Sequence, residues 1–426
     1  MKIFNYIKKV NLLLAVAALL IVSCNKLELK PTLDEPATQD TTPTLATLIS
    51  ASDYSLLKLL ADKGGVTPIL AVPTARYTLF APDDNAILSS LGLPNVATAT
   101  AYFNANFDAA TAKSIVEYHI MPQVITSASI SSTFPNFEYP SFLNPAPTVS
   151  SLLRLSVFPS VRANGAWLNN IPIIGANISA VNGVMHKIAA PNLPPAQDLW
   201  TRITTDTTLR YFTAAINRAD SGVAAGSRLQ DALNTAVNPS AIASNLTVFA
   251  PTDDAMKAFM VGAIMKALIT ANPGLPPGDA QTQAVGIVNT YGLLILTNPY
   301  ALNSLLGATV TPTLAKGIVA YHILSSQGGT YTPPGVRVFS VNIPAAASTV
   351  KTLLNSAGGP YALHPGVTVQ ATFVSPISGI SIVSAATVKG FANQTASNII
   401  IGRTSSDLHA ANGVIHKIDQ VLIPQQ

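Results

Sequence analysis

A sequence cassette that occurs twice constrains the fold of this chain most strongly. Residues 77–82 read YTLFAP and residues 246–251 read LTVFAP. Each copy ends in a near-identical string, NGVMHKI at 182–188 and NGVIHKI at 412–418, and a Tyr-His pair lies between the two landmarks in each copy. Landmarks that recur in the same order within one chain indicate a duplicated domain.

The Tyr-His pairs are Tyr118-His119 and Tyr321-His322. With these landmarks the chain resembles the fasciclin (FAS1) family, whose domains carry an F-A-P-T-x-x-A segment, a Tyr-His pair and a terminal N-G-x-x-H-x-I strand. The resemblance implies two tandem fasciclin-like domains, at 44–195 and 196–426. The motif residues expected to have structural roles are Phe80, Pro82, Asn182, Gly183 and His186 in the first copy and Phe249, Pro251, Asn412, Gly413 and His416 in the second.

Helical patterns precede short β runs in the first copy, and the second copy repeats this order. Residues 108–119 have helix-like spacing of apolar side chains, whereas the chain after about 123 alternates in strand-like runs. Asn182-Gly183 predicts a tight hairpin between the last two strands. The Asp83-Asp84 and Asp253-Asp254 pairs follow a strand and are expected to cap helices. The sequence therefore predicts an α+β fold, with a compact antiparallel β core (a sandwich or wedge) and helices packed around it.

The second copy has longer connections than the first. Phe249 and His322 are 73 positions apart, against 39 for Phe80 and His119, and this excess predicts an insertion near 270–312. His322 and His416 are 94 positions apart, against 67 for His119 and His186, and this second excess predicts an insertion near 323–395. An apolar stretch at 285–306 could be read as a membrane helix. Its Asn and Pro residues and the absence of flanking basic residues favour a helical hairpin. Because large loops on a rigid scaffold often bind ligands, we expect any private ligand at the second copy.

The N-terminus has the pattern of a bacterial lipoprotein signal. A basic start and a short apolar run lead to Cys24, the only cysteine in the chain, so residues 1–23 are expected to be removed and Cys24 acylated. An ordinary secretory signal with an incidental cysteine is the alternative. Residues 24–43 are polar and rich in Pro and Thr, which predicts a tether that could reach about 60 Å. The expected location is the outer membrane of the cell envelope, surface-exposed or on the periplasmic face.

Charge argues against a nucleic-acid partner. The net charge of +4 includes three lysines in residues 1–23, and no Lys/Arg cluster stands out elsewhere. Only 10% of residues are charged and 48% are hydrophobic, so the surface must be largely neutral and polar. Such a surface suits contact with a protein or glycan.

The repeated histidines have competing interpretations. His119 and His322 follow core-like residues and are expected to hold a helix against the β core, although the family resemblance implies adhesion contacts at the Tyr-His pair. His186 and His416 alternate with apolar strand residues and are expected in the core. A two-nitrogen metal site between the histidines of one copy is the less favoured alternative, because no ligand spacing supports it.

Common enzyme motifs are absent from the sequence: it has no G-x-S-x-G, H-E-x-x-H or P-loop pattern, and glutamate does not occur after Glu138. A Ser/His/Asp site assembled from distant residues stays open. The expected function is a non-catalytic envelope lipoprotein that mediates adhesion or matrix contact, without metal or cofactor. The alternative is a glycan-binding accessory lipoprotein of a polysaccharide capture system. Beside the lipid bilayer at Cys24, the expected partner is an extracellular protein or glycan, contacted through residues among Tyr118, His119, Trp167, Tyr321, His322, Tyr331 and Tyr361.

Overall fold

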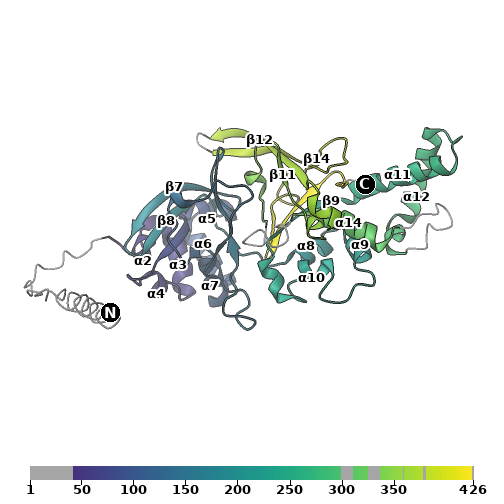
Figure 1. Cartoon of the computed structure of the whole chain (residues 1–426). Coiled ribbons are helices and arrows are strands. Elements are labelled where there is room, and N and C mark those ends of the chain that lie inside the picture. The colour runs from purple at the N-terminus through teal and green to yellow at the C-terminus, as the bar shows by residue number, and fades with distance from the viewer. Residues whose placement is uncertain (1–41, 299–309, 325–335, 358, 378–379, 425–426) are drawn as a thin grey trace, which may run out of the picture. The chain divides into compact units, whose positions relative to one another are not determined.

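The computed structural model describes residues 42–298, 310–324, 336–357, 359–377 and 380–424. The expected signal peptide, Cys24 and nearly all of the tether lie outside these residues, as does Tyr331. The chain from Thr42 to Gln426 forms one compact unit with two main sheets, one for each copy of the cassette (Figure 1).

The first sheet has six strands. The YTLFAP strand lies beside the closing strand of its copy, and both are buried along most of their length. The strand order is β2 (Ile120–Met121), β1 (Tyr77–Pro82), β8 (Gly183–Ile188), β7 (Ile171–Ala180), β6 (Gly165–Leu168) and β5 (Pro159–Arg162).

The second sheet repeats this centre and extends it. Its eight strands follow the order β10 (Ile323–Leu324), β9 (Leu246–Pro251), β16 (Gly413–Ile418), β14 (Ser397–Ile399), β13 (Ile380–Lys389), β12 (Val367–Ile377) and β11 (Ser348–Val350), with β15 (Leu408–Ala410) also paired to β16. A small sheet of β3 (Tyr139–Pro140) and β4 (Ser156–Val157) completes the strands of the described residues.

The two copies have the same register at their centre. In the first, Phe80 lies opposite His186, and in the second Phe249 lies opposite His416. The α+β prediction is confirmed, with one difference: β1·β8 and β9·β16 are parallel, whereas the other pairs in these sheets are antiparallel. A long stretch with helices separates each parallel pair, which gives the chain the crossover that parallel strands require.

Two consecutive polar residues follow the FAP strand in each copy, and each of them caps a different helix. Asp83 caps α5 (Asp84–Leu91) by accepting from the Ala86 N–H at 2.7 Å, and Thr252 caps α11 (Asp253–Ala271) by accepting from Ala255 at 3.2 Å. The next residue in each copy caps a neighbouring helix instead. Asp84 accepts from the Leu56 N–H at 2.8 Å near the start of α3 (Ser55–Lys63). The predicted capping is confirmed for Asp83 and Asp84, whereas in the second copy Thr252, and neither Asp253 nor Asp254, caps the helix that follows the strand.

Asp253 matches Asp84 and caps a neighbouring helix in the second copy, where it accepts from the Tyr211 N–H at 2.9 Å at the start of α9 (Arg210–Ala219). The carboxylate also complements the positive end of that helix dipole. The remaining α-helices of the described residues are α2 (Leu45–Leu48), α4 (Thr67–Leu70), α6 (Val96–Asn106), α7 (Ala109–Tyr118), α8 (Leu199–Thr205), α10 (Leu229–Leu233), α12 (Pro277–Thr297) and α14 (Pro312–Tyr321).

The insertion near 270–312 is helical where the structure describes it. Helices α11 and α12 pack against each other, as Figure 1 shows. They lie at the chain positions of α5 and α6 in the first copy and are about twice as long, so the predicted hairpin arises largely by lengthening an existing helix pair. Among the described residues, no helix is long and apolar enough to cross a membrane.

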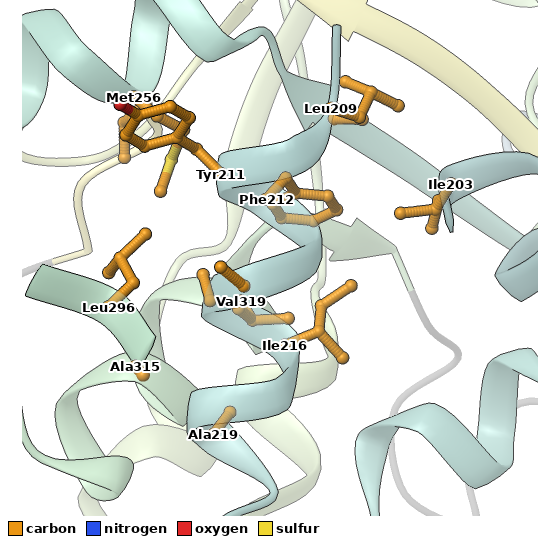
Figure 2. Packing of buried hydrophobic residues seen from close by; sticks show 14 of the residues in the cluster. Ile203, Leu209, Tyr211, Phe212, Ile216, Ala219, Met256, Leu296, Ala315 and Val319 are labelled. Atoms are coloured by element: carbon orange, nitrogen blue, oxygen red, sulfur yellow. The ribbon is translucent and has the colours of Figure 1, made fainter. Parts of the chain in front are cut away.

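The helices of the second copy gather around α9, which crosses the middle of the largest core cluster. Figure 2 shows Phe212 and Ile216 of α9 close to Val319 of α14, with Leu296 of α12 on another side. These side chains are at most 4% exposed. Their burial fixes α14 against the rest of the copy, so that the outer face of α14 is presented in a defined position.

Candidate functional site

The Tyr-His histidines are buried clamps. Nδ1 of His119 lies 2.7 Å from the Ile115 carbonyl, and its Nε2 accepts from the Asn192 N–H at 2.9 Å. In the second copy, Nδ1 of His322 lies 2.8 Å from the Ile318 carbonyl and Nε2 accepts from the Leu422 N–H at 2.9 Å. Each imidazole therefore joins the end of a helix to the segment that follows the last strand.

This geometry suits neutral imidazoles, with Nδ1 as the donor and Nε2 as the acceptor. Burial lowers the pKa of His119 and of His322 to about 4, because a charged ring would lose its hydration. Both side chains are at most 1% exposed. The structural interpretation of the histidines is supported, and neither ring is accessible to a partner in this conformation.

The tyrosines of the two pairs are also buried, and they differ in partners. Tyr321 donates to the Gly366 carbonyl at 2.6 Å and accepts from the Phe391 N–H at 2.9 Å. Tyr118 donates to the Ser156 carbonyl at 3.1 Å. Burial raises the pKa of both phenols to about 12. The predicted partner contact through the Tyr-His pairs has no exposed side chain to carry it.

A buried arginine lies beside Tyr118. The Tyr118 hydroxyl is 3.5 Å from Nε2 of His409, and Arg337 places Nη1 2.7 Å from the same nitrogen. Arg337 also donates to Asn245 Oδ1 at 2.8 Å and lies over the Phe158 ring at 5.1 Å. Burial, together with the positive charge of Arg337, keeps the pKa of His409 well below its usual value, so His409 accepts as a neutral ring. These groups form a structural network in which Arg337, Asn245 and Tyr118 are buried and His409 is partly exposed.

The strand histidines have separate partners from the Tyr-His histidines. Nε2 of His186 lies 2.7 Å from the Ile125 carbonyl, and Nε2 of His416 lies 2.9 Å from the Val338 carbonyl. Both rings are fully buried and pack against the phenylalanine opposite, with centroids 5.2 Å apart for Phe80 and 5.8 Å for Phe249. In the described part of the chain no cluster of three or more His, Cys, Asp or Glu side chains could hold a metal ion.

The Asn-Gly motif fixes the first helical segment of each copy. Asn182 accepts from the Leu45 N–H at 2.9 Å and donates to the Leu70 carbonyl at 2.8 Å. Asn412 does the same with the Leu199 N–H at 2.9 Å and the Leu233 carbonyl at 3.0 Å. The following Gly183 has a φ of 151°, and a Cβ there would lie 1.9 Å from the Tyr77 carbonyl oxygen. These motif residues are accounted for by folding alone.

The prediction that Trp167 is an exposed contact residue is wrong. Trp167 is 2% exposed and packs in a cluster with Phe158, Phe339, Val341 and Val414, which come from both copies. The first copy alone would leave this strand face uncovered, and residues of the second copy supply the cover. Tyr361 is 46% exposed, as expected for a contact residue.

Tyr361 lines a pocket of about 470 Å³ in the second copy. The first wall is the loop that starts α10, including Arg228; the second is the face of α14 formed by Thr313, Lys316, Gly317 and Ala320; the third comprises η5 (Leu353–Ala357) and η6 (Gly359–Leu363). The volume falls in the range of small-molecule sites, and the floor is apolar where Leu229, Leu353 and Leu354 contribute.

The charges of this pocket are unbalanced. Arg228 and Lys316 are both exposed, and within the described ranges neither forms an ion pair. The carboxylate in the lining, Asp231, accepts from the N–H groups of Gly226 at 2.6 Å and Arg228 at 3.2 Å. Asp231 is therefore held in its own loop, and the pocket presents a net positive charge because two cations in its lining face one carboxylate.

The equivalent helix face in the first copy carries a paired charge. Lys113 of α7 stands at the chain position of Lys316, and it lies 3.8 Å from Glu117, one turn further on. Gly64 approaches this face so closely that an added Cβ would lie 2.5 Å from the Lys113 backbone nitrogen. The chain has Ala320 where the first copy has Glu117, and Gly317 where it has Ser114. The two copies thus present different surfaces from matching helices.

Two further cavities are weaker candidates for a ligand site. One of about 700 Å³ lies around the start of α11, where Asp253 pairs with Arg210 at 3.0 Å and Lys417 pairs with Asp206 at 2.5 Å. The other, of about 100 Å³, is an apolar space in the first copy beside His119. The first is lined by charges that largely satisfy one another, and the second is too small for a ligand of ordinary size.

The sequence led us to expect a ligand at the second copy, but it did not indicate that the loop at 226–238 and the face of α14 would form pocket walls. One feature of the sequence could have indicated the α14 face. The second copy has no glutamate, so the position that corresponds to Glu117 lacks a carboxylate. That loss leaves Lys316 without the helical partner that its equivalent has.

Comparisons with known proteins match part of the chain to one family. A family model described as Fasciclin domain matches residues 52–194. Among solved structures, the chain is similar to a FAS1 domain pair from the insect cell adhesion molecule fasciclin I, at 14% identity and a TM-score of 0.30, over 87% of this chain and 96% of that one. No curated protein matches the chain. Residues 52–194 therefore match the model of a fasciclin domain, and the second copy repeats the parallel pair of central strands found in these residues.

Proposed function

We propose that this chain is a non-catalytic adhesion protein of the cell envelope, anchored through an acylated Cys24, that contacts its extracellular partner through the second copy. Fasciclin domains are generally non-catalytic adhesion domains, and the family match at residues 52–194 supports such a role for this chain. The observation that carries the proposal is the open, positively charged pocket on a fasciclin-type scaffold whose motif histidines and tyrosines are all buried.

The sequence supports the anchor. Cys24 follows a basic and apolar leader, and the polar residues up to 43 would let the folded unit stand clear of a bilayer. Several acyl chains on one residue would hold the protein firmly, because each buried methylene contributes about 0.8 kcal/mol.

The second candidate function is capture of a polysaccharide for a transport system. One observation favours it over a purely structural matrix contact: the pocket is concave and carries an exposed aromatic ring, Tyr361, beside polar side chains. Aromatic rings with a polar tip suit ligands that have both apolar and polar faces.

Protease treatment of intact cells tests the proposal. Cells that produce the wild-type chain should lose the folded unit to added protease, while the membrane-retained remnant stays with the cells. The Cys24→Ala chain should leave the membrane fraction. Protection of the wild-type chain until the outer membrane is broken would place it in the periplasm and overturn the adhesion proposal.

A further inference from the structure

We infer that the pocket between α10, α14 and η6 binds an acidic saccharide, a chain containing uronic acids, with Arg228 and Lys316 facing the carboxylates and Tyr361 stacked on a sugar ring. The inference rests on the proposed function, because it names the ligand class of the same pocket. The residues belong to separate segments, at 226–238, 313–320 and 353–361, that only the fold brings together.

Charge is the first argument. The two cations stand on different walls and have no acidic partner in the described ranges, so they give the pocket a positive potential toward an entering anion. A guanidinium can bind a carboxylate with two parallel hydrogen bonds, while an ammonium acts as a compact point charge. A uronate chain carries carboxylates along its length and can meet both.

The remaining lining matches a sugar ring. Tyr361 is 46% exposed, and its ring can cover the apolar C–H face of a saccharide. Side chains that donate or accept hydrogen bonds surround the space, and they suit the hydroxyl groups of a sugar. They are Ser227, Asn238, Thr313 and Ser356.

Gly317 provides an independent argument that the space is kept open. It lies inside α14, where glycine is among the least favourable residues. An added Cβ would meet no atom within 4 Å, so packing against protein does not require glycine there. A side chain at 317 would project into the pocket, and its absence leaves room for a ligand.

The shape favours a saccharide over an acidic peptide. An extended peptide is commonly recognised by an open strand edge or a long groove, whereas this lining consists of a loop, one helix face and short 3-10 turns. A concave pocket of about 470 Å³ suits a short oligosaccharide segment.

Isothermal titration of the full-length chain in detergent tests the inference. The probes are trigalacturonate, the neutral maltotriose and hexaglutamate. We expect binding of trigalacturonate that weakens with added salt and at least tenfold weaker binding of the other two. Lys316→Gln should weaken trigalacturonate binding roughly five- to tenfold. Lys266→Gln, the same change at an exposed lysine on α11, should leave it unchanged.

Filling the pocket gives a second test. Gly317→Leu should abolish detectable binding, whereas Gly286→Leu, at an equally open glycine on α12, should not. Circular dichroism confirms that each variant is folded. No trigalacturonate binding by the wild-type chain, or binding by Lys316→Gln and Gly317→Leu that is as tight as that of their controls, would overturn the inference. Preferred binding of hexaglutamate would replace the saccharide with an acidic peptide.

These results are separable from the proposed function. Surface exposure in the protease experiment without trigalacturonate binding would leave the adhesion proposal standing and remove the ligand class. Binding by a chain that proves periplasmic would keep the ligand class and remove adhesion.

Discussion

Helices α7 and α14 occupy the same place in the two copies and end in the same Tyr-His pair, yet their outer faces differ. In α7, Lys113 is paired with Glu117, and Gly64 packs against the helix backbone at Lys113. In α14, Ala320 stands at the position that corresponds to Glu117, so Lys316 has no carboxylate one turn away, and it lines a pocket. The buried side of the helix preserves the fold, and the exposed side has diverged.

The residues that the copies share are those with buried partners. The motif histidines, asparagines and glycines repeat with the same hydrogen bonds or close approaches in both copies. A side chain that satisfies buried backbone groups is costly to change, whereas an exposed helix position is not. This contrast predicts large, matched effects at the shared residues and unmatched effects at the outer faces.

The largest effects are expected at the buried asparagines. Asn182→Ala and Asn412→Ala each leave a buried N–H and buried carbonyls without their partner, so each should lower the free energy of unfolding by about 3 kcal/mol. Urea denaturation measures the change, with the exposed Asn85→Ala as the control. A loss in one copy only would break the equivalence of the two motifs.

Acidification should act on both copies through His119 and His322. Their folded pKa of about 4 lies below the unfolded value near 6.5, so the unfolded chain binds more protons between these values. Stability is complete above pH 6.5 and falls as the pH drops toward 4, by about 3 kcal/mol for each histidine.

The test is denaturation between pH 4 and 7 for the wild-type chain and for His119→Gln and His322→Gln. Each variant is less stable at neutral pH but should show a smaller dependence on pH. Other buried histidines shift in the same direction and set the residual slope. An unchanged slope in either variant would show that its histidine is protonated in the folded chain.

Removing the tyrosine hydroxyl should lower stability by slightly different amounts in the two copies. Tyr321→Phe removes two short hydrogen bonds and should cost about 2 kcal/mol, whereas Tyr118→Phe removes longer contacts of 3.1 and 3.5 Å and should cost about 1 kcal/mol. Thermal unfolding of the two variants side by side measures the difference. A larger loss of stability for Tyr118→Phe than for Tyr321→Phe would show that the network around Arg337 contributes more to stability than its geometry indicates.

The last change, Ala320→Glu, copies the Lys113–Glu117 arrangement into α14. Ala320 is 6% exposed, so the new carboxylate is partly buried one turn from Lys316 and should lower the free energy of unfolding by about 1 kcal/mol. It should nevertheless weaken trigalacturonate binding roughly tenfold, because it neutralises the pocket. Glu117→Ala, the matched change in the first copy, should create no binding site.

Much of the fold could be predicted from the sequence. The repeated strings indicated the duplication, the Asn-Gly turn and the caps after each FAP strand, because these depend on local backbone chemistry. Trp167 was misjudged because its cover comes from residues of the other copy, more than 150 positions away. The parallel pairing of β1 with β8 and the second cap made by Asp84 also depend on distant segments.

The pocket was the least predictable part. Its walls come from segments separated by tens of residues, and its charge follows from an absent glutamate more than from any motif. Tyr361 was expected as a contact residue, but nothing local in the sequence places it opposite Lys316. Such a site emerges only when packing of α14 against α9 fixes the helix face (Figure 2).

Hydrogen–deuterium exchange with saturating trigalacturonate tests the central claim, that only the second copy presents a recognition face. The account predicts slower exchange at 226–232, 313–320 and 353–361, and no change at 110–117 in the matching helix of the first copy. Protection of 110–117, or of neither helix, would contradict it.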